Sequence, residues 1–165
     1  KGLGVIPVSI NLSRASLYFE SVVKQYHSIA SEIGVDTELV PIEITESAAI
    51  DNENIKALAD RFHSNGFPLM VDDFGAGYSS LATLNMKCFD TLKIDKSLID
   101  YIGDFSGEKL LEHTIALAKD LGLNVTAEGV ETEEQVDFLR KINCDSIQGY
   151  YYSKPLPEQE FKKLL

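Results

Sequence analysis

The sequence predicts an α/β fold in which a parallel sheet curves into a (β/α) barrel, and two observations lead to this prediction. The 165 residues contain six short β-branched runs, each followed by a helical pattern, and such alternation is typical of a parallel sheet. A polar residue also stands at or near the C-terminal end of every run, whereas an open doubly wound sheet places its chemistry at one switch point. These polar residues are Asn11, Glu43, Asp72, Lys93, Glu128 and Gln148.

Each expected strand is a short, mainly apolar run rich in β-branched residues. In chain order the expected strands cover residues 5–11, 39–44, 68–72, 91–95, 124–128 and 146–150. A complete barrel of this kind has eight strand–helix units in about 250 residues, so six units predict an incomplete barrel.

A helical pattern follows each of these runs. The expected helices cover residues 17–33, 54–65, 79–86, 107–121, 133–142 and 157–165. The second has apolar residues at helical spacing before Gly66 ends it, and Gly122 ends the fourth in the same way. No linker, low-complexity tract or charge run divides the chain, so a single domain over residues 1–165 is expected.

The composition disfavours two classes of partner. With 26 acidic and 15 basic residues the formal net charge is −11, which disfavours a nucleic-acid polymer or an anionic membrane surface as a partner. No apolar run approaches the ~18 residues of a membrane span. The two cysteines, Cys88 and Cys144, are far apart and lack metal-ligand spacing, as expected of free thiols in a reducing cytosol.

The pair Asp72-Asp73 is the first candidate site. Two carboxylates at a strand end can share one pocket when a divalent cation lies between them, and oxygen ligands suit Mg²⁺ or Mn²⁺. The alternative is an Asx turn in which Asp73 caps the next helix. Asp73-Phe74-Gly75 has the letters of a kinase motif without the preceding catalytic segment, and Ser80 replaces the third glycine of a dinucleotide fingerprint.

Glu43 and Glu46 form a second acidic pair. Glu43 interrupts an apolar strand, and a buried carboxylate needs a partner or a metal ion. Glu46 belongs either to the same site or to a strand-to-helix turn with capping side chains. Asn11 is likewise either a turn residue or a neutral oxygen ligand.

Lys93 lies in a strand that should be buried, where an ammonium group needs surrounding carboxylates. Beside metal ions it can hold a nucleophilic water or neutralise phosphate charge, and the alternative is a structural pair with Asp95. Glu128 and Glu131 repeat the pattern of an acid at a strand end, a glycine and a second acid. Gln148 adds an amide able to bind the polar edge of a ligand.

Together these residues indicate hydrolysis of a phosphate ester assisted by two metal ions. A Ser-His-Asp arrangement does not compete, because His27, His63 and His113 all lie in helical patterns. A glycosidase with two carboxylates remains an alternative, since barrels often host that chemistry.

The motifs resemble those of one known family, the EAL domain, the bacterial phosphodiesterase that linearises cyclic di-GMP. The resemblance runs from Val8 to Pro157 and depends on six segments in family order. These segments are Asn11-Leu12-Ser13, Glu43-Ile44-Thr45-Glu46-Ser47, Asp72 to Leu81, Leu92-Lys93-Ile94-Asp95, Ala127-Glu128-Gly129-Val130-Glu131 and Gln148-Gly149-Tyr150.

The resemblance implies a TIM-like barrel with two Mg²⁺ or Mn²⁺ ions at its C-terminal mouth. By position, Asn11, Glu43 and Asp72 correspond to ligands of one ion, and Asp72 with Asp73 to ligands of the second. Glu128 corresponds to the second-site acid that binds metal or accepts the proton of the attacking water.

The remaining positions correspond to supporting and substrate-binding roles in the family. Lys93 would hold the attacking water, while Gln148 and Asp95 would contact the substrate. Glu46 and Glu131 would anchor loops, and Glu46 would couple the metal site to a dimer surface at residues 79–86.

The sequence departs from the family at its beginning. The Glu-Ala-Leu segment of the family, with a metal-ligating Glu and a nearby phosphate-binding Arg, belongs before Val8, so we expect the domain to be truncated at its N-terminus. An isolated fragment would be inactive or completed by a partner chain, because its first and last strands would be open edges.

The resemblance also defines the expected biology. It implies a cytoplasmic homodimer whose parent chain also carries GGDEF or sensory domains, with any membrane anchor in other domains. The alternative to the phosphodiesterase is a non-catalytic cyclic di-GMP receptor or interaction module of the same fold.

Overall fold

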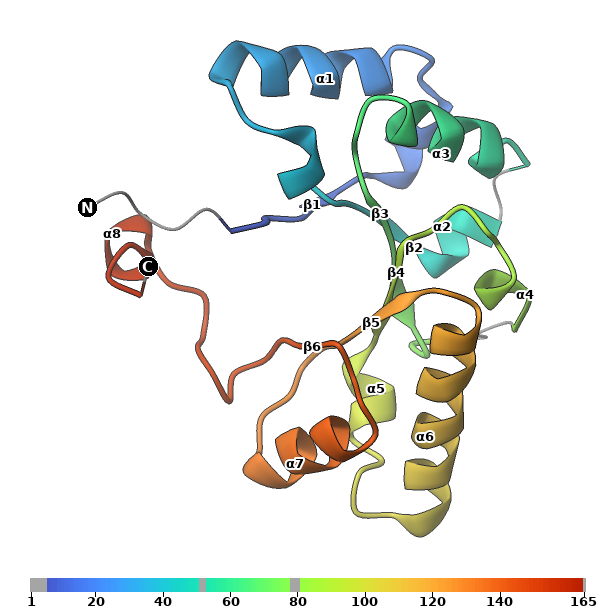
Figure 1. The fold of residues 1–165 in the computed structure, drawn as a ribbon, viewed down its shortest axis with the longest axis vertical. Helices are drawn as coiled ribbons and strands as arrows, with labels where there is room; N and C mark the ends of the chain where they lie inside the picture. Colours follow the sequence, from blue (N-terminus) through green and yellow to red (C-terminus); the bar gives the residue numbers. More distant parts are fainter. Residues whose placement is uncertain (1–5, 51–52, 78–80, 165) are drawn as a thin grey trace.

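The computed structural model describes residues 6–50, 53–77 and 81–164. It contains one sheet of six strands, and all strand pairs are parallel. The strands are β1 (Ile10–Asn11), β2 (Ile42–Thr45), β3 (Leu69–Phe74), β4 (Thr91–Ile94), β5 (Asn124–Ala127) and β6 (Ser146–Ile147). Their order in the sheet is their order in the chain, with no reversal (Figure 1). This order confirms the barrel-type parallel sheet and rules out a doubly wound sheet with a switch point.

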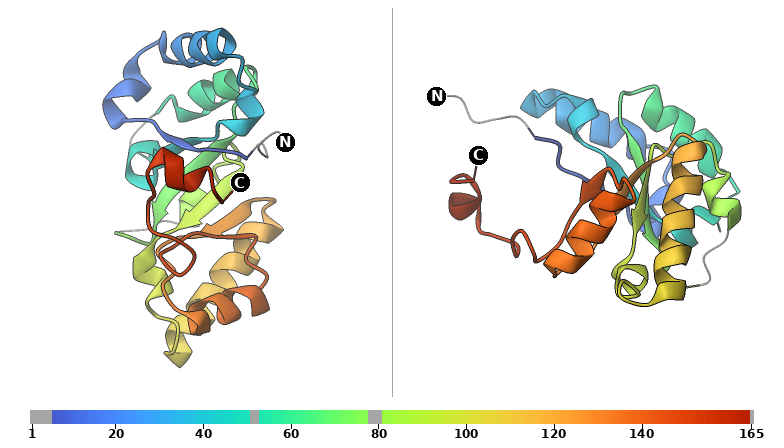
Figure 2. Two further views of the ribbon diagram at one scale, coloured as in Figure 1. Left: turned by 90° about the vertical axis from the view of Figure 1, so that its left-hand side faces the viewer. Right: turned by 60° about the horizontal axis from the view of Figure 1, so that its bottom comes forward.

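Helices connect the strands and cover the outer side of the curved sheet (Figures 1 and 2). The α-helices are α1 (Val22–Ile33), α2 (Glu46–Ile50), α3 (Ile55–His63), α4 (Leu81–Leu84), α5 (Lys96–Ile99), α6 (Phe105–Asp120), α7 (Glu133–Lys141) and α8 (Glu158–Phe161). The described residues also form the 3₁₀ helices η1 (Arg14–Tyr18) and η2 (Thr37–Leu39). No helix among the described residues is both long and apolar enough to cross a bilayer.

The predicted elements differ from the structure at strand ends and at helix beginnings. The strand expected over 39–44 begins only at Ile42, because Leu39 ends η2, and the strand expected over 146–150 ends at Ile147. The helix expected over 17–33 is two elements, because Ser13 caps η1 and α1 begins only at Val22. Asp104 caps α6 through the Gly107 N–H, so this helix begins two residues earlier than predicted. The short helices α2 and α5, each just after a strand, were missed. Of the strand expected over 5–11 the structure shows β1 at its end, and Val5 lies outside the described residues.

The core consists of the central strands and the inward faces of the helices. Ile42, Ile44, Leu69 and Leu92 are fully buried, which explains why these strands are nearly continuous apolar runs. Phe62 from α3 packs edge-on against Phe67, with ring centroids 5.8 Å apart. The central strands are thereby packed into the core below the polar side chains at their C-terminal ends.

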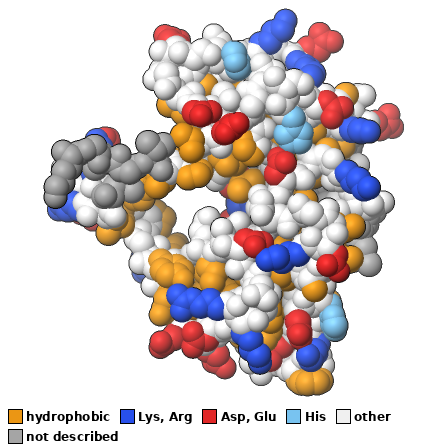
Figure 3. Space-filling model, viewed as in Figure 1, with side chains coloured by type: hydrophobic (Ala, Val, Ile, Leu, Met, Phe, Trp, Pro, Cys, Tyr) orange, Lys and Arg blue, Asp and Glu red, His pale blue; other side chains and the backbone are white. Residues whose placement is uncertain are grey.

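β1 and β6 are the edge strands of the described sheet, and apolar side chains are exposed near both. Val8 and Ile10 are exposed at β1, and Tyr150 and Leu156 are exposed after β6. The segment after β6 leads to α8, which stands apart from the other helices (Figure 2). In Figure 3 hydrophobic side chains border the opening between this segment and the rest of the molecule.

The N-terminal ends of the strands are fixed by a repeated arrangement. Asp90, just before β4, accepts a hydrogen bond from the Leu69 N–H at 2.7 Å and pairs with His63 of α3 at 2.9 Å. Asp145, just before β6, accepts one from the Val125 N–H at 2.9 Å and pairs with Lys119 of α6 at 2.7 Å. In both cases a carboxylate just before one strand (β4 or β6) binds the backbone of the preceding strand (β3 or β5). It also pairs with a side chain of the helix that leads into that preceding strand (α3 or α6).

We expect Asp145→Ala to lower the free energy of unfolding by about 1–2 kcal/mol, because the Val125 N–H loses its acceptor. Partial burial raises the pKa of Asp145, but hydrogen bonds from Lys119 and the Val125 N–H outweigh it, so the folded pKa lies below the ordinary value. The stabilisation is therefore complete above about pH 4 and is lost as the pH falls through the folded pKa.

Urea unfolding of both proteins at pH 7 and below pH 4 measures this difference. Asp137→Ala is the matched control, since Asp137 is exposed and its pair with Arg140 spans 3.9 Å. Equal stability of Asp145→Ala and the original protein at pH 7 would contradict the prediction.

Candidate active site

The side chain of Lys93 lies at the centre of the candidate site. Its ammonium Nζ is 2.7 Å from Glu43 Oε1, 3.0 Å from Asp72 Oδ1 and 2.7 Å from Glu128 Oε1. Lys93 is in β4, Glu43 in β2 and Asp72 in β3, and Glu128 directly follows β5, so four neighbouring strands contribute one group each. Lys93 is 4% exposed, Glu43 6% and Asp72 8%. The structure thus brings together four of the predicted site residues.

A break in the ladder between β3 and β4 brings a second acid to the site. Val71 pairs with Leu92 and Phe74 with Ile94, so both Asp72 and Asp73 lie opposite Lys93. Asp73 has a left-handed φ of 60°, and its N–H donates to Asp72 Oδ1 at 2.9 Å. The predicted acidic pair therefore lies in a β-bulge. The alternative in which Asp73 caps the next helix falls partly outside the described residues, because residues 78–80 lie just before α4.

The charges in this cluster shift the pKa values of its members. Burial raises the pKa of Glu128, and together with smaller contributions from Asp72 and Glu43 it outweighs the lowering by Lys93. Burial and the negative charge of Asp72 also raise the pKa of Asp73. Burial lowers the pKa of Lys93, but hydrogen bonds to Glu128, Glu43 and Asp72 outweigh it, so the net shift is upward. One ammonium faces more carboxylates than it can neutralise.

Glu46 lies beside this cluster and contacts a residue that sequence reasoning missed. Glu46 begins α2 and is buried, and its Oε1 accepts a hydrogen bond from Thr83 Oγ1 of α4 at 2.9 Å. Thr83 is itself buried. This bond joins the end of β2 to the helix after the Asp72-Asp73 loop. The dimer surface expected over 79–86 falls partly outside the described residues.

Asp95 does not pair with Lys93, which was the structural alternative for that lysine. Its carboxylate instead caps α5 by accepting the Ser97 N–H at 2.9 Å. Glu131 is exposed and pairs with Lys96 Nζ at 3.4 Å. Lys96 was also missed, because a lysine in the first turn of a short helix gives no sequence signal of its own.

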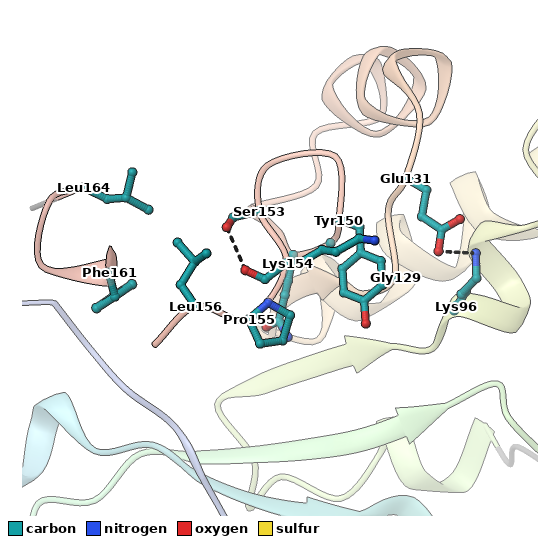
Figure 4. Close-up of a pocket in the computed structure, with 12 residues that line it drawn as sticks. Lys96, Gly129, Glu131, Tyr150, Ser153, Lys154, Pro155, Leu156, Phe161 and Leu164 are labelled. Atoms are coloured by element: carbon teal, nitrogen blue, oxygen red, sulfur yellow. Dashed lines mark hydrogen bonds and ion pairs between the residues drawn. The ribbon is translucent and has the colours of Figure 1, made fainter. Parts of the chain in front are cut away.

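Asn11 and Gln148 come from the outermost strands. Asn11 is the register partner of Glu43, and it is exposed at the edge of the sheet. Gln148 directly follows β6 and lines a cavity of about 500 Å³ together with Lys96, Tyr150 and the C-terminal residues Phe161 and Leu164 (Figure 4). This cavity adjoins the C-terminal strand ends that carry the acids.

The donor set fits a hard divalent cation in its chemistry, because it consists of carboxylate and amide oxygens with an excess of negative charge. In the described parts of the chain no three His, Cys, Asp or Glu side chains form a cation cage by themselves. The acids converge on Lys93 Nζ instead, and this ammonium holds them together at the C-terminal ends of the strands.

The comparisons with known proteins agree on one family. The family whose description is EAL domain matches residues 1–155. The cyclic di-GMP phosphodiesterase NbdA of Pseudomonas aeruginosa is 36% identical over 160 residues, covering 96% of this chain and 20% of NbdA. The chain spans between 19% and 29% of the length of the first curated relatives that it matches.

Solved structures give the same result. The EAL domain of Mycobacterium smegmatis DcpA has a TM-score of 0.90 and 35% identity, over 97% of this chain and 73% of that one. Klebsiella pneumoniae BlrP1 in a complex with manganese and cyclic di-GMP has a TM-score of 0.85 and 30% identity, over 92% of this chain and 40% of that one.

We expect Lys93→Met to lower the free energy of unfolding by about 3–5 kcal/mol, because three carboxylates then lose the ammonium partner that they share. Urea unfolding in the presence of a chelator measures this loss. Lys109→Met is the matched control, because Lys109 pairs with Glu112 on the exposed surface of α6, where such an ion pair contributes little to stability. If the two variants are equally stable, the buried cluster is not what holds these strand ends together.

Proposed function

Because this chain belongs to the EAL domain family, we propose that it is the greater part of the catalytic domain of a cyclic di-GMP phosphodiesterase. The reaction is attack of water on one phosphodiester of cyclic di-GMP, which opens the ring to linear pGpG. The protein as a whole is then a cyclic-guanylate-specific hydrolase.

One observation carries this proposal, which is the convergence of Glu43, Asp72 and Glu128 on Lys93 Nζ at the C-terminal ends of four strands. A module that only binds a nucleotide has no need of a buried lysine among acids that can activate water. Glu128 has a raised pKa and lies 2.7 Å from Lys93 Nζ, as suits a carboxylate that acts as a general base and accepts a proton from water.

Each residue has a role in this proposal. Glu128 accepts the proton of the attacking water, while Lys93 positions that water and offsets negative charge on the phosphate. Gln148 and Asp95 contact the substrate. Glu46, through Thr83, and Glu131, through Lys96, hold the loops that carry the acids.

We further propose that two Mg²⁺ or Mn²⁺ ions bind these oxygens. Asn11, Glu43 and Asp72 would hold one, and Asp72, Asp73 and Glu128 the other. Bound there, two divalent ions supply positive charge to the phosphodiester and lower the pKa of the attacking water.

The same proposal covers the setting of the domain. The phosphodiesterase works as a cytoplasmic homodimer, with GGDEF or sensory domains in the same polypeptide. The 165-residue chain alone is inactive unless another chain supplies partners for β1 and β6, since these strands are the edges of the described sheet.

Incubation of the full-length protein with cyclic di-GMP and Mg²⁺ or Mn²⁺ tests the proposal, with the linear dinucleotide measured by ion-exchange chromatography. We expect Glu128→Gln to reduce kcat by about 10²–10⁴-fold, because the proton acceptor is lost. Asp72→Asn should be similarly impaired, and a chelator should stop hydrolysis.

Glu112→Gln, on the outer surface of α6, is the control that should match the original protein. If no product forms and Asp72→Asn is indistinguishable from the original protein, the proposed phosphodiesterase activity is wrong. Tight binding of cyclic di-GMP without turnover or metal dependence would instead identify a receptor of the same fold.

A further inference from the structure

The short helix α5 occupies a central position among the acid-bearing loops. It begins one residue after β4, the strand that carries Lys93, with Asp95 between them. At this point the backbone is bonded on both sides, because the Asp95 N–H donates to Phe74 O and the Glu128 N–H donates to Ile94 O, both at 2.9 Å. The residues of α5 therefore follow immediately beyond the last bonds to the neighbouring strands.

On one side α5 contacts the loop after Asp72 and Asp73. Gly75 has a φ of +103°, and a Cβ placed there would overlap Leu98 Cδ1 and Cγ. Ser97 Oγ donates a hydrogen bond to Gly75 O at 3.1 Å. The loop is thus fixed from α5 by one packing contact and one hydrogen bond.

On the other side α5 contacts the loop after Glu128. Gly129 has a φ of +69°, and a Cβ there would overlap the aliphatic stem of Lys96. The ammonium of the same lysine reaches Asp100 at 2.8 Å. It also reaches Glu131 at 3.4 Å (Figure 4). The stem of Lys96 therefore packs against Gly129, while its ammonium pairs with Glu131, two residues further along the chain.

We propose that α5 is a positioning element that sets the distance between Asp72 and Glu128 by separate contacts to their two loops. Leu98 and Ser97 hold the Gly75 loop, and Lys96 holds the Gly129 loop. Lys93 joins the acids by charge, whereas α5 fixes the backbone from which the acids project. For its catalytic consequence this inference rests on the proposed phosphodiesterase.

Hydrogen exchange gives a test that does not depend on catalysis. The amide of Ala76 is bonded to Asp73 O at 3.1 Å, and the amide of Val130 to Gln148 O at 3.1 Å, so each reports on one loop. Leu98→Ala should make Ala76 exchange about fivefold faster and leave Val130 unchanged. Lys96→Ala should do the reverse, and Ser97→Ala should repeat the Leu98→Ala pattern more weakly.

Leu98→Ala and Lys96→Ala are controls for each other, because loss of global stability would speed the exchange of both amides in both variants. That uniform result, or no change in either amide, would overturn the inference. Lys109→Ala, on the outer surface of α6, should leave both amides as they are.

Steady-state hydrolysis of cyclic di-GMP by the full-length variants separates positioning from substrate binding. Lys96→Ala should lower kcat about tenfold with KM within about twofold, because misplaced acids weaken the transition state more than the ground state. Lys96→Arg keeps the stem and the charge and should restore kcat. A raised KM with unchanged kcat would assign Lys96 to substrate binding and overturn the inference. If the original protein shows no hydrolysis, the proposed function fails while the exchange pattern still decides the role of α5.

Discussion

The buried ammonium of Lys93 is the interaction on which the rest of this structure depends. A charged group that is 4% exposed is tolerable only among acids, and the three acids are tolerable only because the ammonium is there. Each acid comes from a different strand, so the cluster requires these strands to be parallel and adjacent, with their C-terminal ends at one edge of the sheet. The apolar core below supplies the driving force for the sheet, while the cluster selects the arrangement in which all four polar groups meet.

Much of the fold could be predicted because each strand carries two signals, an apolar run and a polar residue at its end. Glu43, Asp72, Lys93 and Glu128 were predicted to meet, and they do, since parallel strands bring their C-terminal ends to one edge. The barrel-type order also followed from the sequence, because six chemical strand ends do not fit one switch point. Helix boundaries were less predictable, and Ser13 and Asp104 show why, since capping side chains decide where a helix begins.

The contacts that support the site could not be predicted in the same way. The β-bulge that places Asp72 and Asp73 opposite one residue depends on the register between β3 and β4, which the sequence of β3 alone does not contain. Thr83 and Lys96 are ordinary residues in helical segments, and only the folded chain brings them to Glu46 and Glu131. Short helices such as α5 have too few residues for a periodic pattern, so the element that touches both acid-bearing loops gave no signal.

The sequential order of the strands has a consequence for the synthesis of the protein on the ribosome. Because each strand pairs with the next one along the chain, partners such as Ile10 and Ile42, or Thr91 and Asn124, are a few tens of residues apart. Glu43 and Asp72 are synthesised before Lys93, and Glu128 after it. A nascent chain therefore presents two acids first, receives their counter-charge with β4 and completes the cluster only when β5 emerges. The four groups at the centre of the site thus become available for pairing in the order in which they are translated.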